Sequence, residues 1–406
     1  MEKSNCLKPI AISAYSAVSA CGLGNATLLA ALLSNTSHLA PLTLFELAFP
    51  TQVGEIKLPL PGIASALEIY DSRNSQVALA ALNNPEDGIR QAVEQAKKRY
   101  GHERIGVVIG TSTSGLYETE SAYGVFLETH KMPDDFHFVT KHAYQATARF
   151  LQQELGLAGP CYAISTACSS SAKAIATGQR LIAGGVCDAV LVGGADTLCR
   201  LTLRGFKSLD LIAEQACRPM DRERNGINIG EAAALLVLEK ITPENAHLPR
   251  VLSVGESSDA HHMSTPHPEG FGAALAMENA LTLAGIKATD VDYLNLHATA
   301  TRINDQVENT AVYSVLGDQV PCSGTKGITG HTLGAAGALE TIIALLALKQ
   351  QFIPGTAGLR QLEADCRCHV IADPKLNQKL KIAMSNSFGF GGNNACVIVA
   401  RGEGHA

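Results

Sequence analysis

Short apolar runs alternate along the chain with longer segments of helical periodicity, and this alternation restricts the fold more than any other feature. The runs 105–110 and 189–194 lie in the first half, and 292–296 and 381–385 lie in the second. Short apolar runs bounded by turn residues are typical of buried strands. Strands that alternate with helices predict an α/β fold with largely parallel sheets. At 406 residues the chain is long enough for two large cores.

One cysteine lies where such a strand meets a helix. The run Cys161–Ile164 has the pattern of a buried strand, and apolar residues recur at helical spacing from Ala172 to Gly184. Cys168 is therefore expected near a helix N-terminus, where the helix dipole and free N–H groups lower the pKa of a thiol. A free cysteine is more commonly a small buried apolar residue, and its position alone does not decide between the two interpretations.

Two histidines lie in similar places further along. His297 follows the strand-like run 292–296, and His331 lies in a glycine-rich turn that leads into a helical segment. A lone histidine in such a turn is more often a hydrogen-bonded structural group than a catalyst. Cys168, His297 and His331, however, all fall at strand ends or helix starts, where α/β sheets build their sites. The order of the three residues predicts a cysteine nucleophile assisted by two histidines.

Four motifs extend this pattern: Thr166–Ser171, His297–Thr301, Lys326 with Gly330-His331, and Asn386–Gly392. In this order they resemble the β-ketoacyl-acyl-carrier-protein synthases, the decarboxylating condensing enzymes that carry a Cys-His-His triad. The resemblance spans nearly the whole chain. The segments Gly193–Leu198 and Gly226–Ala234 are most similar to the ketosynthases of bacterial aryl-polyene gene clusters.

The resemblance implies the thiolase fold, in which two duplicated halves pack as five α-β-α-β-α layers. The expected division gives an N-terminal half, 1–250, with the nucleophile, and a C-terminal half, 251–406, with both histidines. The site would then form where the halves meet.

The resemblance also implies the chemistry of an acyltransferase. Cys168 would take an acyl group from a carrier protein, and the backbone N–H groups of Cys168 and Phe390 would form the oxyanion hole. Malonyl-carrier protein would then lose carbon dioxide. His297 and His331 would stabilise the enolate oxygen, and Lys326 corresponds to the lysine of the family's site.

Further residues receive roles by the same matching. Glu308 corresponds to the acid that helps to hold Lys326, although an ordinary ion pair beneath the site is an equal alternative. The remaining members of the expected substrate-binding and gating groups are Thr299, Thr301, Phe388 and Phe390, where flanking glycines would let Phe390 swing.

A basic segment is expected to receive the acidic carrier protein. Arg204 and Lys207 lie where the family has its carrier-facing segment, and a solvated charged turn is as good an interpretation. The chain departs from the family at Ala298 and Ala300, where glycine and serine are usual, and at Arg302, where proline is usual. We expect the two alanine methyls to narrow the passage beside His297, which would favour a flat conjugated acyl chain over a flexible saturated one, although neutral drift explains the departures equally well.

Composition restricts partners and location. A net charge of −6 and a pI near 6.1 argue against nucleic acid. No run reaches the roughly 18 apolar residues of a membrane span, and eleven cysteines without paired spacing predict reduced thiols in the cytoplasm. The resemblance implies no metal and no redox cofactor, since the substrates are carried on the 4′-phosphopantetheine of acyl carrier protein. It further implies a homodimer, or a heterodimer with a chain-length-factor-like homologue.

Several alternatives share the fold. A housekeeping type II fatty-acid elongation synthase is the main one. A non-catalytic chain-length factor would lack the nucleophile, whereas Cys168 is present. A degradative thiolase would place a second cysteine near 389–393, and a coenzyme-A-primed synthase would have asparagine in place of His331.

Overall fold

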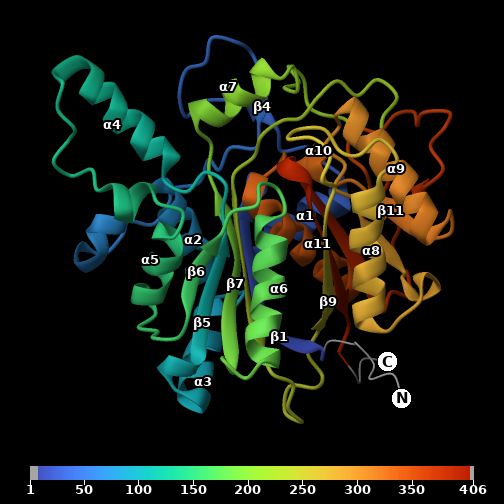
Figure 1. Cartoon of the computed structure of the whole chain (residues 1–406), viewed down its shortest axis with the longest axis horizontal. Helices are drawn as coiled ribbons and strands as arrows, with labels where there is room; N and C mark the ends of the chain where they lie inside the picture. The colour runs from blue at the N-terminus through green and yellow to red at the C-terminus, as the bar shows by residue number, and fades with distance from the viewer. Residues whose placement is uncertain (1–7, 403–406) are drawn as a thin grey trace.

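The computed structural model describes residues 8–402 (Figure 1). Its central sheet contains β1 (Ile10–Ser19), β2 (Gly22–Leu23), β5 (Ile105–Gly110), β6 (Cys161–Ile164), β7 (Ala189–Asp196), β8 (Ala232–Glu239), β9 (Arg250–Ser258), β10 (Tyr293–Asn295), β11 (Pro321–Ser323), β12 (His369–Val370), β13 (Ile382–Gly389) and β14 (Asn393–Ala400). The helices are α1 (Gly24–Ser34), α2 (Arg73–Asn83), α3 (Ile89–Tyr100), α4 (Leu116–Thr129), α5 (Ala146–Glu154), α6 (Ser170–Ala183), α7 (Arg200–Ser208), α8 (Phe271–Ala284), α9 (Arg302–Leu316), α10 (Lys326–Thr329) and α11 (Ala336–Gln350). A separate small ribbon pairs β3 (Ala40–Pro41) with β4 (Gln52–Val53).

The strands of the central sheet follow the order β12-β11-β10-β13-β14-β9-β1-β8-β7-β5-β6, with β2 paired to β1. The first and second halves of the chain join through β1 and β9, where Ile10 pairs with Val251 and Ala11 with Arg250. This short ladder is the hydrogen-bonded seam between the halves. The division of the chain into 1–250 and 251–406 stays a prediction.

Strand direction differs from the expectation of largely parallel sheets. β5, β6 and β7 are parallel to one another, and so are β10 to β13, but β1, β8, β9 and β14 pair antiparallel with their neighbours. One reason is visible in the chain itself. Only Phe390–Gly392 connects β13 to β14, and a parallel crossover needs a dozen or more residues.

Helices from both halves form the middle layer. α6 and α11 lie between strands of the first half and strands of the second (Figure 1). They pack against each other and contact strands of both halves, and they share one apolar core with those strands. A second core lies beneath α2, α3 and α5, and a third beneath α8 and α9 on the opposite outer face. The five layers therefore run α-β-α-β-α, as the resemblance implied.

The sequence located the elements near the site well. β5 and β6 begin and end at the expected residues, and α6 covers the expected helical segment. β6, however, is half-buried and not buried, because it is an edge strand that pairs only with β5.

Within the part of the chain that the structure describes, one helical segment, Leu333–Gln350, is long and apolar enough to cross a membrane. Because 89% of it is buried inside the protein, it has the character of a core helix.

Candidate active site

Cys168 lies in a tight turn between β6 and α6. Ala167 has a φ of +52°, a conformation that residues other than glycine seldom adopt. Its carbonyl accepts hydrogen bonds from Ser170 Oγ at 2.5 Å and Ser112 Oγ at 3.1 Å, so the strained turn is held from two sides. The turn presents Cys168 just before α6 begins, as the sequence predicted.

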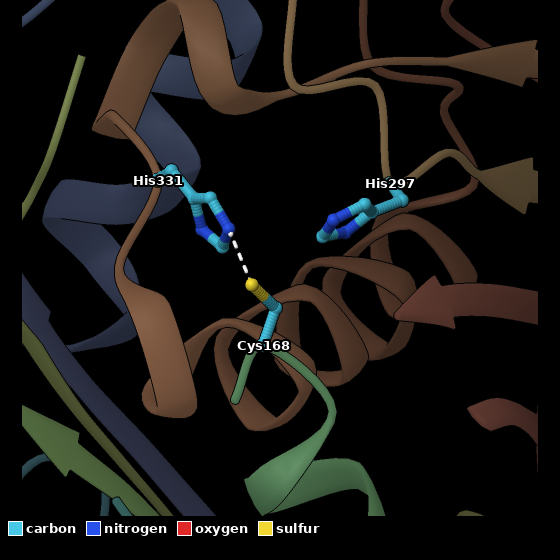
Figure 2. Close-up of side chains that lie close together, drawn as sticks. All are labelled: Cys168, His297 and His331. Carbon is cyan, nitrogen blue, oxygen red and sulfur yellow. Dashed lines mark hydrogen bonds between the residues drawn. The ribbon is translucent and has the colours of Figure 1, made fainter. Parts of the chain in front are cut away.

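Both predicted histidines face this cysteine, and Figure 2 shows their rings on either side of the thiol. His331 Nε2 lies 3.0 Å from Cys168 Sγ. The centroids of the His297 and His331 rings are 5.3 Å apart and the rings are nearly perpendicular. All three side chains are buried. The structure therefore brings the whole predicted triad together.

The hydrogen bonds at Nδ1 fix which ring nitrogen carries the proton. The backbone N–H of Leu333 donates to His331 Nδ1 at 3.2 Å, and the ammonium of Lys326 lies 3.3 Å from His297 Nδ1. Burial lowers the pKa of both histidines well below the usual value, and the charge of Lys326 lowers it further. Each ring is thus neutral, with Nδ1 as acceptor and Nε2–H as donor. The site holds two preorganised N–H donors.

The same tautomers bear on metal binding. Cys168 Sγ and one nitrogen of each histidine lie within 4.8 Å of one another, and thiolate with imidazole is a familiar donor set for zinc. Coordination needs a free lone pair on the imidazole nitrogen. At Nε2 of both histidines this electron pair is used in the N–H bond. The two N–H donors therefore suit an anionic oxygen better than a metal.

The pKa of Cys168 differs from expectation. The helix N-terminus was expected to lower it, but burial of the 7% exposed residue raises it to about 11. Lys326 and the backbone N–H groups of Phe390 and Cys168 act in the opposite direction without overcoming burial. The expectation was wrong because desolvation of the thiolate outweighs the helix dipole.

Lys326 is held by a residue that sequence reasoning missed. It forms a buried salt bridge with Glu340 of α11 and donates a hydrogen bond to the carbonyl oxygen of His297 at 2.6 Å. Burial raises the pKa of Glu340 to about 7, while Lys326 lowers it. Glu340 was recognisable in principle, because it is the one acidic residue in the apolar helix α11.

Glu308 plays a different part from the one expected. Its carboxylate accepts hydrogen bonds from the backbone N–H groups of His297 and Ala298, both at 2.7 Å, and from Asn386 Nδ2 at 3.2 Å. It forms no salt bridge with Lys326, which pairs with Glu340, so the expected pairing was wrong. Glu308 borders a small pocket beside the large cavity and not the large cavity itself, and its place in the substrate-binding group stays a prediction. Burial raises its pKa to about 7. Glu308 positions the turn that carries His297.

Two cavities meet at Cys168. The larger, about 520 Å³, is bordered by the triad and by Thr299, Thr301, Phe388 and Phe390. The smaller, about 400 Å³, is bordered by Ser112, Thr113, Ala167, Leu333 and residues of α7. Cys168, Phe206 and Phe390 border both, and the two aromatic rings pack with centroids 5.5 Å apart. The aromatic pair therefore stands between the cavities beside the thiol.

The alanine departures do not narrow either cavity. Ala298 and Ala300 are fully buried and border neither space. The Ala298 methyl lies in the outer core, close to Gly324. Their cost is in the backbone, since φ is +33° at Ala298 and +66° at Ala300. The expectation that these methyls shape the acyl passage was wrong.

The two predicted docking residues lie outside the cavities, on α7. Arg204 is exposed, and Lys207 lies over the ring of Phe49 at 5.7 Å. The same helix lends Phe206 to the cavity wall, so a protein bound to these side chains would sit beside the opening. Among the described residues that border the larger cavity, Arg302 is the single arginine or lysine.

Comparison with known proteins places this fold and site in a family. Residues 77–243 match the family model described as "Beta-ketoacyl synthase, N-terminal domain", and residues 249–360 match "Beta-ketoacyl synthase, C-terminal domain". The ketosynthase (ApeO) solved in complex with its chain length factor (ApeC) from Xenorhabdus doucetiae superposes with a TM-score of 0.89. It is 38% identical, and the match covers 97% of this chain and 98% of that one.

Relatives found by sequence agree. The 3-oxoacyl-[acyl-carrier-protein] synthase 2 of Coxiella burnetii is 32% identical over 390 residues, which cover 91% of this chain and 93% of the relative. Nodulation protein E of Rhizobium meliloti is 37% identical over 300 residues, which cover 72% and 74%. The fold and the triad define a thiolase-fold condensing enzyme. More closely, the chain belongs to the β-ketoacyl synthase family, as its motifs implied.

Proposed function

We propose that the protein catalyses the decarboxylative condensation of a Cys168-bound acyl group with malonyl-acyl carrier protein. The observation that carries this proposal is the triad itself: a thiol 3.0 Å from one neutral imidazole, with a second facing it, where two cavities meet. The geometry supplies one nucleophile and two N–H donors, which is what this two-stage reaction needs.

In the first stage Cys168 Sγ attacks the thioester carbonyl of an acyl-carrier protein. The bond from Sγ to the acyl carbon forms, the bond to the pantetheine sulfur breaks, and the thiol proton passes to that sulfur. The backbone N–H groups of Cys168 and Phe390, which already act on the sulfur, are placed to stabilise the oxyanion. Thr299 and Thr301 border the larger cavity and would bind the pantetheine arm.

In the second stage malonyl-carrier protein loses carbon dioxide. The electron pair of the broken bond passes to an enolate, whose oxygen accepts from Nε2–H of His297 and His331. The enolate carbon then attacks the acyl carbon, the bond to Sγ breaks, and the released Cys168 thiolate takes up a proton from solvent. Both histidines keep their own protons, as their tautomers and lowered pKa values favour. No redox cofactor or metal is needed for this sequence of steps.

The paired cavities divide the substrate between them. The carrier's arm would enter through the larger cavity, and the acyl chain would occupy the smaller one. Because Phe390 separates the two and is followed by Gly391 with a φ of +77°, the segment 390–392 is suited to move when the acyl chain passes.

Two surfaces suit the proposed partners. α7, with Arg204 and Lys207, would receive acyl carrier protein beside the cavity. A homologous subunit would cover α4 and the edge strand β6, since α4 projects from the body in Figure 1. The exposed large apolar side chains on α4 and in the segment between α4 and α5 are Tyr123, Val125, Leu127, Met132, Phe138, Val139 and Tyr144. We propose a cytoplasmic enzyme paired with an identical subunit or a chain-length-factor-like one, in aryl-polyene synthesis.

Mass spectrometry of the Cys168 peptide tests the reaction directly. Incubation with an acyl-carrier protein should add the acyl mass to Cys168, and addition of malonyl-carrier protein should release carbon dioxide and a product two carbons longer. Cys168→Ala should abolish condensation, whereas Cys187→Ala, a buried cysteine before β7, serves as the matched control. His297→Ala and His331→Ala should each slow decarboxylation on the order of 10²-fold. Condensation by the Cys168→Ala protein would refute the assignment.

The docking and pathway proposals need separate assays. Reversing the charges of Arg204 and Lys207 should raise the KM for acyl-carrier protein and weaken its salt dependence, and unchanged kinetics would overturn that role. Competition between 2-enoyl and saturated carrier thioesters of equal length, with and without the partner subunit, tests the pathway. A preference for saturated chains in both settings would indicate fatty-acid elongation.

A further inference from the structure

A buried carboxylate lies behind the active site without a cationic partner. Asp196, the last residue of β7, is fully buried, and within residues 8–402 no lysine or arginine forms a salt bridge with it. Burial raises its pKa, while its hydrogen bonds act in the opposite direction. Its partners are three backbone N–H groups and two hydroxyls, all placed to donate. Such a shell suits an ionised acceptor, and it is costly to leave unsatisfied.

One set of these hydrogen bonds leads to the cysteine. Asp196 Oδ1 accepts from Thr111 Oγ1 at 2.6 Å and from the N–H and Oγ of Thr113 at 2.8 and 2.7 Å. The N–H of Ser112 is 2.9 Å from both carboxylate oxygens. Ser112 Oγ in turn donates to the carbonyl of Ala167, the strained residue that precedes Cys168. Asp196 thereby fixes the loop that holds the nucleophile's turn.

The other carboxylate oxygen leads to a histidine. Asp196 Oδ2 accepts from the N–H of Gly334 at 2.6 Å. Gly334 follows Leu333, whose own N–H donates to His331 Nδ1 and so places the proton on Nε2. A side chain at position 334 is excluded, because a Cβ there would lie 2.6 Å from Asp196 Oδ2 and 2.8 Å from Ser112 N. Gly334 therefore packs closely against both the Asp196 carboxylate and the backbone of Ser112.

We propose that Asp196 is a positioning residue that locks the Cys168 turn and the His331 turn into one catalytic geometry across the junction of the two halves. It contacts neither the thiol nor the imidazole. It acts through Ser112 on one side and through Gly334 and Leu333 on the other. The consequence for catalysis rests on the proposed role of His331 as an enolate donor, whereas the effect on the tautomer of His331 does not.

Asp196→Asn tests the lock with almost no change of shape. The four donors around Oδ1 favour the amide oxygen at that position. The NH₂ group then takes the position of Oδ2, where it faces the N–H of Gly334 and cannot accept its hydrogen bond. We expect kcat for malonyl-carrier decarboxylation to fall about 10- to 100-fold while KM changes less than about threefold, as for other lost orienting groups. Gly334→Ala should give the same result, since its methyl wedges the contact apart with no change of charge.

Two further readouts separate positioning from general damage. In ¹⁵N-histidine NMR spectra, His331 should be an Nε2–H tautomer in the wild type and a mixture of tautomers in both variants. Adding His331→Ala to Asp196→Asn should cost little beyond His331→Ala alone, because both changes remove the same donor.

Glu55→Gln is the matched control. Glu55 is also a buried carboxylate that accepts from two backbone N–H groups and a hydroxyl, at Thr43 and Leu44, but its carboxylate accepts no hydrogen bond from the turns that carry Cys168 and His331. It should leave decarboxylation and the His331 signals unchanged.

The proposal is overturned if both variants are folded, by thermal melting, and keep the wild-type tautomer and decarboxylation rate. A wild-type protein that fails to decarboxylate malonyl-carrier protein would instead defeat the proposed function, and the tautomer measurement would still decide the role of Asp196.

Discussion

Removal of the buried Lys326–Glu340 ion pair should separate its effect on stability from its effect on catalysis. Both side chains are almost inaccessible, at 1% and 3% exposure. In Lys326→Met the stranded glutamate takes up a proton, and because its pKa is already about 7 in the wild type, this step adds less than about 1 kcal/mol at pH 7. In Glu340→Leu the stranded ammonium must lose a proton, which costs about 4.6 kcal/mol for an ordinary lysine. That larger loss agrees with the roughly 3–5 kcal/mol typical of a broken buried pair.

The double variant Lys326→Met/Glu340→Leu should recover most of that loss, to within about 1 kcal/mol of the wild type, because no buried charge remains. Its decarboxylation rate should stay about 10- to 100-fold low, since His297 Nδ1 has lost the ammonium that fixes its tautomer. Urea unfolding at pH 7 and fixed protein concentration measures the first quantity, and carbon dioxide release measures the second. Additive destabilisation in the double variant would refute the electrostatic coupling, and wild-type decarboxylation would refute the orientation of His297.

Three further outcomes are expected. Because burial raises the pKa of Cys168 to about 11, alkylation of Cys168 in the folded protein by iodoacetamide, followed by mass spectrometry of its peptide, should accelerate about tenfold per pH unit between pH 7 and 10; a plateau below pH 9 would contradict this. The pKa of Glu308 is raised to about 7 in the folded state, so its contribution to stability is complete below about pH 4 and is lost as the pH rises through 7; Glu308→Gln should flatten that fall in urea unfolding, and an unchanged slope would count against it. Ala298→Gly should leave acyl-chain preference unchanged in competition assays and alter the free energy of unfolding by no more than about 1 kcal/mol, since relief of a positive φ offsets the added backbone entropy; a shifted chain preference would return Ala298 to the cavity wall.

The sequence was sufficient for the parts of the site that depend on local signals. Cys168, His297 and His331 each lie at a strand end or in a small-residue turn, and these places were readable from periodicity and glycine positions. The partner of Lys326 could not be read from the sequence. Glu308 and Glu340 lie 18 and 14 residues from Lys326 along the chain, and the choice between them depends on how α9 and α11 pack. The side-chain direction of Ala298 was likewise fixed by tertiary packing, which turns its methyl toward Gly324.

The desolvation of the Cys168 thiolate was also not predictable from the local sequence pattern. The start of α6 was correctly located, and a helix dipole there does favour a thiolate. The 7% exposure of Cys168, however, is created by residues from both halves of the chain, and it reverses the sign of the pKa shift.

The shared middle layer also bears on how the protein is made. α11 belongs to the second half of the chain, yet it covers the inner face of the sheet that the first half builds. During synthesis the first half therefore leaves the ribosome with apolar strand residues uncovered until the segment through Gln350 has emerged. At about 5–20 residues per second, the roughly 100 residues from β9 to the end of α11 correspond to an interval of about 5–20 s. For that interval the nascent chain has an exposed core, which makes it a substrate for chaperones that bind apolar segments.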